Sequence, residues 1–363
     1  MKNTFGNQVS ITLFGESHGA MIGAVIDGLP GGIKIDDDFI KSQLSLRRPS
    51  GDISTPRQEA DEYSIVSGVF RGYTTGSPLC ILIPNSNIKS ADYGEKLEIP
   101  RPSHADYAAH IKYNGFENFQ GGGHFSGRIT AAIVAAGAII IAALKNKGIS
   151  IGTHIAKCGG IEDREFADLS SDINYLSDKI FPTLDDIKGE KMMAEIKEAK
   201  QNGDSVGGVL ETAVTGIPAG IGEPWFDSLE GIISHGIFSI PGVKGIEFGA
   251  GFKLADMLGS GANDPFYIEN GVVLTKTNNS GGINGGISNG NPVIFRVAVR
   301  PTPTISKEQE SVNLKDNVNT VLSAKGRHDP CIVHRARVVV DSITAIALLD
   351  MLSQKYGTDW IVD

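Results

Sequence analysis

The chain is poor in cysteine, and its few cysteines are isolated. The 363 residues include three, Cys80, Cys158 and Cys331, and no two of them form a C-x-x-C pair. A disulfide framework or a zinc centre needs an even or clustered set of thiols. The sequence therefore argues against both. We expect no metal site, and a reducing compartment, the cytoplasm.

Long hydrophobic runs and a surplus of positive charge are also missing. The longest apolar run, residues 131–144, is shorter than the roughly 20 residues that span a bilayer, so it predicts a buried helix. The N-terminus has no secretory pattern, and we expect no membrane association. The net charge of −9 argues against nucleic-acid binding. Binding of an anionic small molecule stays possible, because arginines can cluster locally in an acidic protein.

The chain is rich in glycine, with 45 residues, and its length predicts one large domain or two ordinary ones. Apolar patterning predicts strands at 9–13, 21–26, 65–70, 79–83, 149–156, 206–214 and 293–299. Helices are expected at 36–46, 103–113, 131–144, 184–201, 227–238 and 335–356, with Asp36 or Asp37 capping the first and Ser103 the second. The strands cluster between single helices, unlike a doubly wound sheet. Long polar loops at 47–62, 85–103 and 278–291 are typical of functional segments.

The most informative motif is Gly15-Glu16-Ser17-His18-Gly19. Glycines permit a sharp turn close to a ligand, and histidine moves protons near neutral pH. The motif matches the G-x-S-x-G nucleophile elbow of α/β-hydrolases, although such an elbow normally follows several strands. A tight turn whose serine and histidine are satisfied by the backbone is the plain alternative.

Further segments suggest an anionic ligand. Gly121–Gly123 precedes the apolar helix without forming a Walker loop, and Arg128 in the first turn opposes the helix dipole unless an anion is bound. A hinge before a buried helix is the alternative. The planar guanidinium group of arginine suits the binding of phosphate and carboxylate. The plain alternative for each arginine is that it is solvated surface charge. The basic residues occur as Arg47-Arg48 with Arg57, Arg101-Pro102-Ser103-His104, and Lys325, Arg327, His328, Arg335 and Arg337 around Asp329.

Taken together and in order, these motifs resemble the chorismate synthase family over almost the whole chain. The set is Gly15–Gly19 with Asp27-Gly28-Leu29-Pro30, Arg47-Arg48-Pro49 with Thr55-Pro56-Arg57, Arg101–Tyr107, Gly121–Gly123 with Ser126 and Arg128, Gly220–Pro224, Val243–Glu247, Gly281–Ile287, Pro301-Thr302-Pro303, and Arg327-His328-Asp329-Pro330-Cys331.

The resemblance implies a fold, an assembly and a reaction. The fold is α+β, a β-α-β sandwich with helices packed between antiparallel sheets in a single domain over residues 1–363, assembled as a homotetramer. The reaction is the 1,4-elimination of phosphate and the C6 hydrogen from 5-enolpyruvylshikimate 3-phosphate, which gives chorismate. Reduced FMN is required without net redox change. We expect it to be supplied from elsewhere, with NADPH as an indirect reductant.

The resemblance also assigns residues. His104 is similar to the histidine near the leaving phosphate, His18 to the one that protonates reduced flavin, and Asp329 to the acid near flavin N5, with Ser17 and Ser126 supporting that relay. The expected substrate arginines are Arg47, Arg48, Arg57, Arg128 and Arg337. The expected FMN contacts are His124, Phe125, Ser126, Pro241, Gly242, Gly285, Arg300, Pro301, Thr302, Pro303, Thr304 and Arg327.

Some positions depart from the family pattern. His124-Phe125 replaces Arg-Ser, Pro241-Gly242 replaces a common Asn-Ala, and Arg300 stands where lysine is usual. The acid, both histidines and both serines remain, so we expect activity. Two other hypotheses stay open. A serine hydrolase using Ser17 predicts labelling by a fluorophosphonate, and a non-catalytic flavin- or phosphate-binding module predicts FMN binding without phosphate release.

Overall fold

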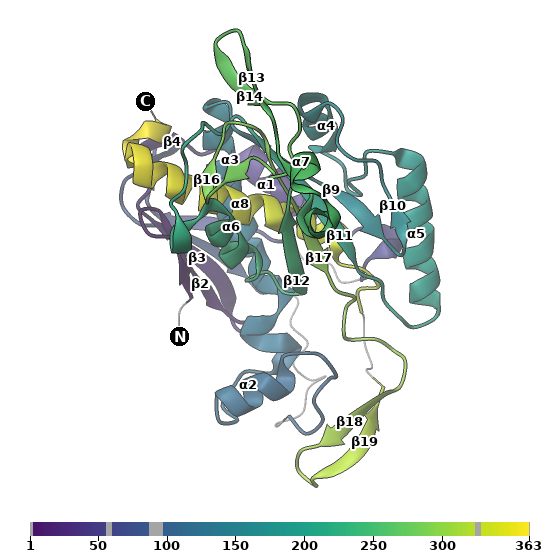
Figure 1. Cartoon of the computed structure of the whole chain (residues 1–363). Helices are drawn as coiled ribbons and strands as arrows, with labels where there is room; N and C mark the ends of the chain where they lie inside the picture. Colours follow the sequence, from purple (N-terminus) through teal and green to yellow (C-terminus); the bar gives the residue numbers. More distant parts are fainter. Residues whose placement is uncertain (1–2, 56–59, 87–96, 324–327, 363) are drawn as a thin grey trace.

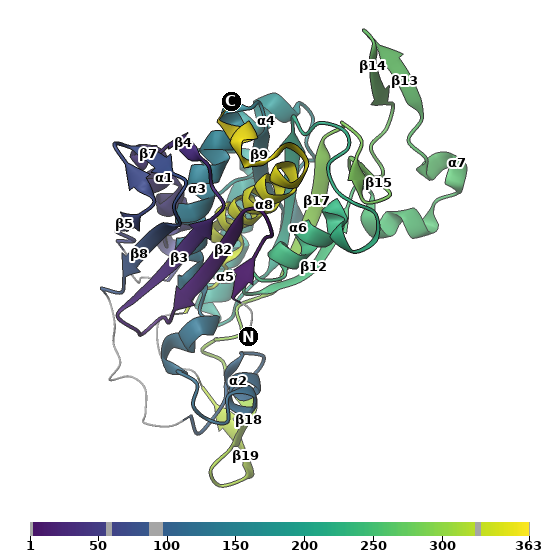
Figure 2. The ribbon, with the colours of Figure 1, turned by 90° about the vertical axis from the view of Figure 1, so that its left-hand side faces the viewer.

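Two five-stranded antiparallel sheets enclose a layer of helices in the computed structural model, which describes residues 3–55, 60–86, 97–323 and 328–362 (Figures 1 and 2). The first sheet has the order β1-β2-β3-β8-β5, and the second β10-β9-β11-β17-β12. The first contains β1 (Thr4–Phe5), β2 (Ser10–Gly15), β3 (Met21–Asp27), β8 (Leu79–Pro84) and β5 (Ser64–Ser67). The second contains β10 (Ile161–Glu162), β9 (Ser150–Cys158), β11 (Gly208–Thr215), β17 (Val293–Val299) and β12 (Val243–Phe248).

The helices between the sheets are α1 (Asp37–Arg47), α3 (Thr130–Asn146), α6 (Leu229–Ile237) and α8 (Val333–Tyr356). Helix α3 packs on α1, α8, β3 and β8, and α8 packs on α6, β9 and β11. The two central helices approach closely at Gly137, where a Cβ would lie 2.3 Å from the Cβ of Ser342. The expected β-α-β sandwich is therefore confirmed (Figure 2).

The hydrophobic helix lies in the core. Within the described part of the chain, the segment Gly127–Asn146 is long and apolar enough to cross a membrane, but 83% of its most apolar window is buried inside the protein. The helical turns before α3 make this segment longer than the apolar run alone indicated. Its burial against α8 and the first sheet confirms the expected core helix.

Smaller elements lie around this core. They are the sheet β4-β7-β6 (Gly31–Lys34, Tyr73–Thr75, Val69–Phe70), hairpins β13–β14 (Phe266–Glu269, Val272–Thr275), β15–β16 (Ile283–Asn284, Ile287–Ser288) and β18–β19 (Gln309–Asn313, Val318–Leu322), and helices α2 (Asp106–Lys112), α4 (Leu169–Leu176), α5 (Asp186–Gln201) and α7 (Gly259–Ala262). Both views show β13–β14 projecting from one end of the molecule and β18–β19 beside α2 at the other (Figures 1 and 2).

Local signals placed some boundaries correctly and others wrongly. Asp36 caps α1, as one of the two expected candidates, by accepting from Phe39 N at 2.9 Å. The single strand expected at 65–70 is wrong, because Gly68 has a φ of 83° and divides it between two sheets. Ser103 does not cap a helix. Its own φ is 59°, and α2 begins at Asp106.

A buried ionic network joins the strands of the second sheet. His154 on β9 has Nδ1 2.9 Å from Asp163 Oδ2 and Nε2 3.0 Å from Glu211 Oε2 on β11. Ionised carboxylates only accept hydrogen bonds, so both ring nitrogens carry protons and the ring is cationic. Burial lowers the pKa of His154, but the two carboxylates outweigh it and hold the pKa above its ordinary value of 6.5.

This network predicts a pH-dependent stability. The stabilisation by protonated His154 is complete below pH 6.5, and it is lost as the pH rises through the raised pKa. We expect His154→Gln to lower the free energy of unfolding by about 3–5 kcal/mol at pH 6, since Asp163 loses its cation and Glu211 keeps only the longer contact with Arg296 at 3.5 Å. The loss should shrink at pH 9. Urea denaturation at both pH values measures it, and an equal loss at both would contradict the assignment.

Candidate active site

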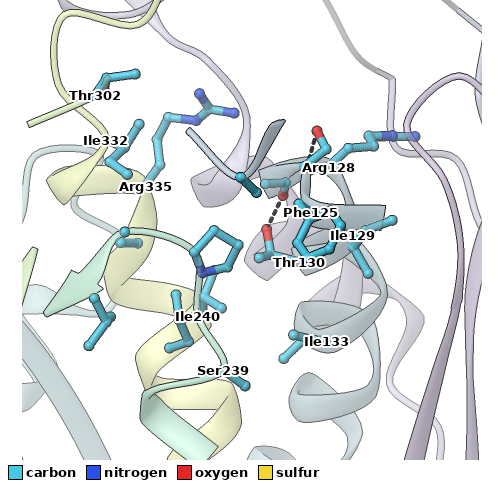
Figure 3. Close-up of a pocket in the computed structure, with 18 of the residues that line it drawn as sticks. Phe125, Arg128, Ile129, Thr130, Ile133, Ser239, Ile240, Thr302, Ile332 and Arg335 are labelled. Carbon is cyan, nitrogen blue, oxygen red and sulfur yellow. Dashed lines mark hydrogen bonds between the residues drawn. The ribbon is translucent and has the colours of Figure 1, made fainter. Parts of the chain in front are cut away.

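A cavity of about 900 Å³ lies at the N-terminal ends of α3 and α8. Its volume is within the usual range for small-molecule sites. The walls come from segments far apart in sequence, and apolar side chains such as Ile133, Ile240 and Ile343 form much of them. Figure 3 shows Arg128 and Arg335 on two sides of this space, with Ile133 and Ile240 further down along the helices.

Two glycine-rich segments form one unit beside the cavity. Gly121 has a φ of 59°, and a Cβ there would lie 2.0 Å from Cε1 of His18 and 3.0 Å from Oγ of Ser17. Only a residue without a side chain permits this approach. Ser17 N donates to Gly123 O at 3.0 Å, and His124 Nδ1 donates to Gly15 O at 2.7 Å. The Gly15–Gly19 turn is therefore fixed against the wall of the cavity.

The placement of Ser17 decides against the nucleophile elbow. Its side chain is buried, and its Oγ has no hydrogen-bond partner among the described residues. Gly121 lines the cavity and contacts Ser17 and His18, which are not themselves lining residues. An elbow serine exposes its Oγ at a strand-to-helix turn, whereas here β2 is followed by the antiparallel strand β3. The hydrolase alternative is wrong on this geometry.

The cationic side of the cavity is built around one buried acid, Asp61. Arg47, at the end of α1, and Arg128, before α3, both line the cavity, and both bind the carboxylate of Asp61. The Asp61 side chain is fully buried. Burial raises the pKa of Asp61, but the two guanidinium groups outweigh it and hold the pKa below its ordinary value. Arg48 donates to Ala60 O and lies outside the cavity wall.

Asp329 lines the cavity between two donors. Its Oδ1 accepts from Thr55 N at 2.9 Å, and its Oδ2 accepts from Arg335 Nη1 at 2.9 Å. Arg335 also donates through Nε to the carbonyl of Arg47 at 2.7 Å. The loop after α1 and the start of α8 are thereby joined at the cavity.

Most of the expected cofactor segments converge on the same cavity. His124, Phe125, Ser126, Pro241 and Gly242 line it, and so do Arg300, Pro301, Thr302, Pro303 and Thr304. His104 lines it as well. Arg57 and Arg327 lie outside the described residues. The structure therefore brings three separated segments together, as the family pattern implied.

Besides Ser17, His18 and Arg48, two further expected residues do not line this cavity. Arg337 is 3% exposed and donates to the carbonyls of Leu176, Ser177 and Lys179. Residues two apart on a helix point to opposite sides, so Arg337 turns away where Arg335 faces the cavity. Gly285 lies in the β15–β16 turn and is not a lining residue. The burial of Arg337 among these carbonyls corrects its expected role in substrate binding, whereas the expected contact of Gly285 with FMN stays a prediction.

Sequence reasoning did not select three residues that shape the site. Arg335 was counted only as part of a basic cluster. Its position two residues before Arg337 on the same helix was the signal that only one of the two could face the cavity. Asp106 stands two residues after His104, a spacing that permits contact in a turn. Asp61 had no local signal, because its partners come from distant segments. Within the described residues, no group of three or more His, Cys, Asp or Glu side chains is placed to hold a metal.

Comparisons with known proteins agree with this arrangement. The family model described as chorismate synthase matches residues 9–353. A chorismate synthase of Dehalococcoides mccartyi is 46% identical, covering 97% of this chain and 96% of its own length. One of Pyrococcus abyssi is 43% identical, with 96% of each chain covered.

A solved structure shares the whole architecture. A crystal structure of chorismate synthase has a TM-score of 0.77 at 30% identity, and the match covers 98% of this chain and 94% of that one. The sequence matches, the fold and the residues that line the cavity all indicate the same family. The chain belongs to the chorismate synthase family, a family of carbon–oxygen lyases of aromatic biosynthesis.

Proposed function

We propose that this chain eliminates phosphate and the C6 hydrogen from 5-enolpyruvylshikimate 3-phosphate to form chorismate, with reduced FMN and no net redox change. It acts as a single domain over residues 1–363 within a cytoplasmic homotetramer, and it receives FMN already reduced, with NADPH as an indirect reductant. The observation that carries the proposal is the charge of the cavity. In a chain of net charge −9, the described lining residues include Arg47, Arg128, Lys244, Arg300 and Arg335 against the single acid Asp329.

Such a cavity suits the proposed substrate. The substrate carries a phosphate and two carboxylates, which need a locally positive pocket in an acidic protein. Guanidinium forks match both kinds of anion. Neutralising the charge that develops on the departing phosphate lowers the barrier to its loss. The arginines therefore bind the substrate and also assist the leaving group.

The residues present also fit a flavin. The cavity combines apolar surface from Ile133, Ile240, Val339 and Ile343, which suits a planar ring system, with cationic side chains that suit a phosphate. His124–Ser126, Pro241–Gly242 and Arg300–Thr304 would hold FMN. Reduced FMN, when bound, supplies transient electron transfer to the substrate, so that carbon–oxygen cleavage proceeds without net oxidation.

The remaining assignments concern protons. His104 delivers a proton or a hydrogen bond to the leaving phosphate, because its ring lines the cavity. Asp329, which is held between Thr55 and Arg335, assists the removal of the C6 hydrogen from the substrate. His18 supplies a proton on the other side of Gly121, supported by Ser17 and Ser126, and the contact of His18 and Ser17 with that glycine supports the relay.

The direct test is an anaerobic assay with chemically reduced FMN and 5-enolpyruvylshikimate 3-phosphate. We expect wild-type protein to release phosphate and chorismate in equal amounts. His104→Gln should lower kcat by about 10²- to 10⁴-fold, the usual contribution of a positioned acid or base. Folded protein that binds FMN without releasing phosphate would favour a binding module. Labelling of Ser17 by a fluorophosphonate would favour a hydrolase.

Asp61 provides a second test, because it holds two cavity arginines at once. Asp61→Asn keeps the volume, but it removes the negative charge and replaces one of the two accepting oxygens with an NH2 group, which only donates and would face a guanidinium. We expect kcat/KM to fall at least about tenfold and the free energy of unfolding to fall by about 3–5 kcal/mol, the usual cost of breaking a buried ion pair. Steady-state kinetics and urea denaturation measure the two effects.

A matched control uses another buried aspartate. Asp172 pairs with Arg164 at 2.6 Å and does not line the cavity. Asp172→Asn should lower stability while kcat/KM stays at the wild-type value. If both variants lost activity equally, the loss would be a general effect of stability, and the assignment of Asp61 to the arginines would be wrong.

A further inference from the structure

We infer that Asp106 and Arg101 form a positioning pair, which fixes the ring of His104 so that Nε2 presents the proton to the cavity. The inference rests on the proposed function, because it refines what His104 does in that reaction. Neither partner lines the cavity, although His104 does. Both would therefore act through the histidine and not on the substrate directly.

The contact between Asp106 and His104 fixes the position of one proton. Asp106 Oδ1 lies 2.6 Å from His104 Nδ1. The Asp106 side chain is 4% exposed, and Asp106 is the first residue of α2. An ionised carboxylate only accepts, so Nδ1 carries a hydrogen and donates it to Asp106. The nitrogen left for a ligand is Nε2, on the other edge of the ring.

Arg101 fixes the carboxylate in turn. Its Nε donates to Oδ2 at 2.8 Å, its Nη2 donates to Oδ1 at 2.8 Å, and its backbone N donates to Oδ2 at 3.0 Å. Burial raises the pKa of Asp106, but hydrogen bonds from Arg101 and His104 outweigh it and hold the pKa well below its ordinary value. Asp106 is therefore an ionised, oriented acceptor throughout the working pH range.

The same geometry places Arg101 close to the histidine. Nη2 of Arg101 lies 3.1 Å from His104 Nδ1. Both groups donate to Oδ1 of Asp106, so they are two donors that share one acceptor. The carboxylate favours the protonated imidazole, and the guanidinium opposes it. Asp106 and Arg101 thus act in opposite directions on the proton of His104.

The other edge of the ring lies beside Gly122, which has no side chain. Nε2 and Cε1 of His104 lie 3.4 Å from the position that a Cβ on Gly122 would occupy. Two further titratable or charged groups from other segments contact the neighbouring residues: His18 lies against Gly121, and Arg300 donates to the carbonyl of Ser103 at 2.6 Å. These groups stay unchanged when Asp106 or Arg101 is substituted, so a difference between variants reports the pair itself.

Two substitutions with opposite expected effects test the inference. In the anaerobic assay, Asp106→Asn should lower kcat at least about tenfold with a smaller change in KM. It should also move the alkaline limb of the pH–rate profile to lower pH, because the protonated ring loses its counter-charge. Arg101→Gln should move that limb to higher pH. A merely structural role would lower activity without moving the limb in either direction.

A matched control exists beside the same helix. His110 Nδ1 lies 2.9 Å from Glu117 Oε1, and neither residue lines the cavity. Glu117→Gln removes a carboxylate from a histidine in the same way. We expect it to leave kcat and the pH–rate profile at wild-type values.

A measurement without turnover separates this inference from the proposed function. Diethyl pyrocarbonate modifies neutral imidazole, and mass spectrometry of the peptide that contains His104 gives its rate at each pH. The pH midpoint should fall in Asp106→Asn and rise in Arg101→Gln. These shifts in a protein that makes no chorismate would refute the proposed function and keep the pair. If Asp106→Asn does not fold, the result for Arg101→Gln alone tests the inference. A pH midpoint of modification that stays at the wild-type value overturns it.

Discussion

The crowding of positive charge at one cavity of an acidic protein is the constraint on which the rest of the structure depends. Arg47, Arg128 and Arg335 lie around the same space, and like charges in a partly buried site repel one another. The structure relieves this with acids that contact the arginines, Asp61 for Arg47 and Arg128 and Asp329 for Arg335. Backbone carbonyls add acceptors, among them Pro84 O for Arg128 at 3.1 Å.

The fold adds to this positive potential through its central helices. The N-terminal residues of both α3 and α8 line the cavity, and a helix N-terminus carries a partial positive charge. Arg128 just before α3 and Arg335 in the first turn of α8 are therefore placed where the helix dipole disfavours a cation. A bound anion removes this conflict, since it interacts favourably with both the dipole and the guanidinium group. The central layer of helices thus forms the core and also brings two positive helix ends to the proposed anion site.

The sequence predicted the parts of the fold that local physics controls. The apolar run at 131–144, the Asp36 cap and the alternating strands needed only neighbouring residues, and the structure confirms them. Hairpins β13–β14 and β18–β19 were not predicted, because their exposed strands lack a buried face with apolar alternation. The division of residues 65–70 depended on the left-handed Gly68, which only the sheet pairing reveals.

The site divides in the same way between local and distant causes. The ordered motifs named the family and most cavity-lining segments, since a resemblance carries residue positions directly. Arg337 was misplaced because the basic cluster was counted without regard to helical phase. Asp61 could not be found, since its φ of 49° and its contacts with Arg47 and Arg128 arise only when three separate segments meet. Residues that line the cavity belong to motifs that the sequence shows, whereas residues that contact and orient them, such as Asp61, are brought into place only by the fold.

Asn85, which no motif indicated, joins Arg128 to the Gly15–Gly19 turn. Asn85 accepts from Arg128 Nε at 3.0 Å and donates to the carbonyls of Glu16 and Gly19 at 2.9 and 2.8 Å. Arg128 and the turn that carries His18 thus share one amide side chain. A displacement of Arg128 would pull on the turn through Asn85, while Asp61 and Pro84 restrain the same guanidinium from other directions. The position of His18 is therefore set by the same hydrogen bonds that orient the guanidinium of Arg128.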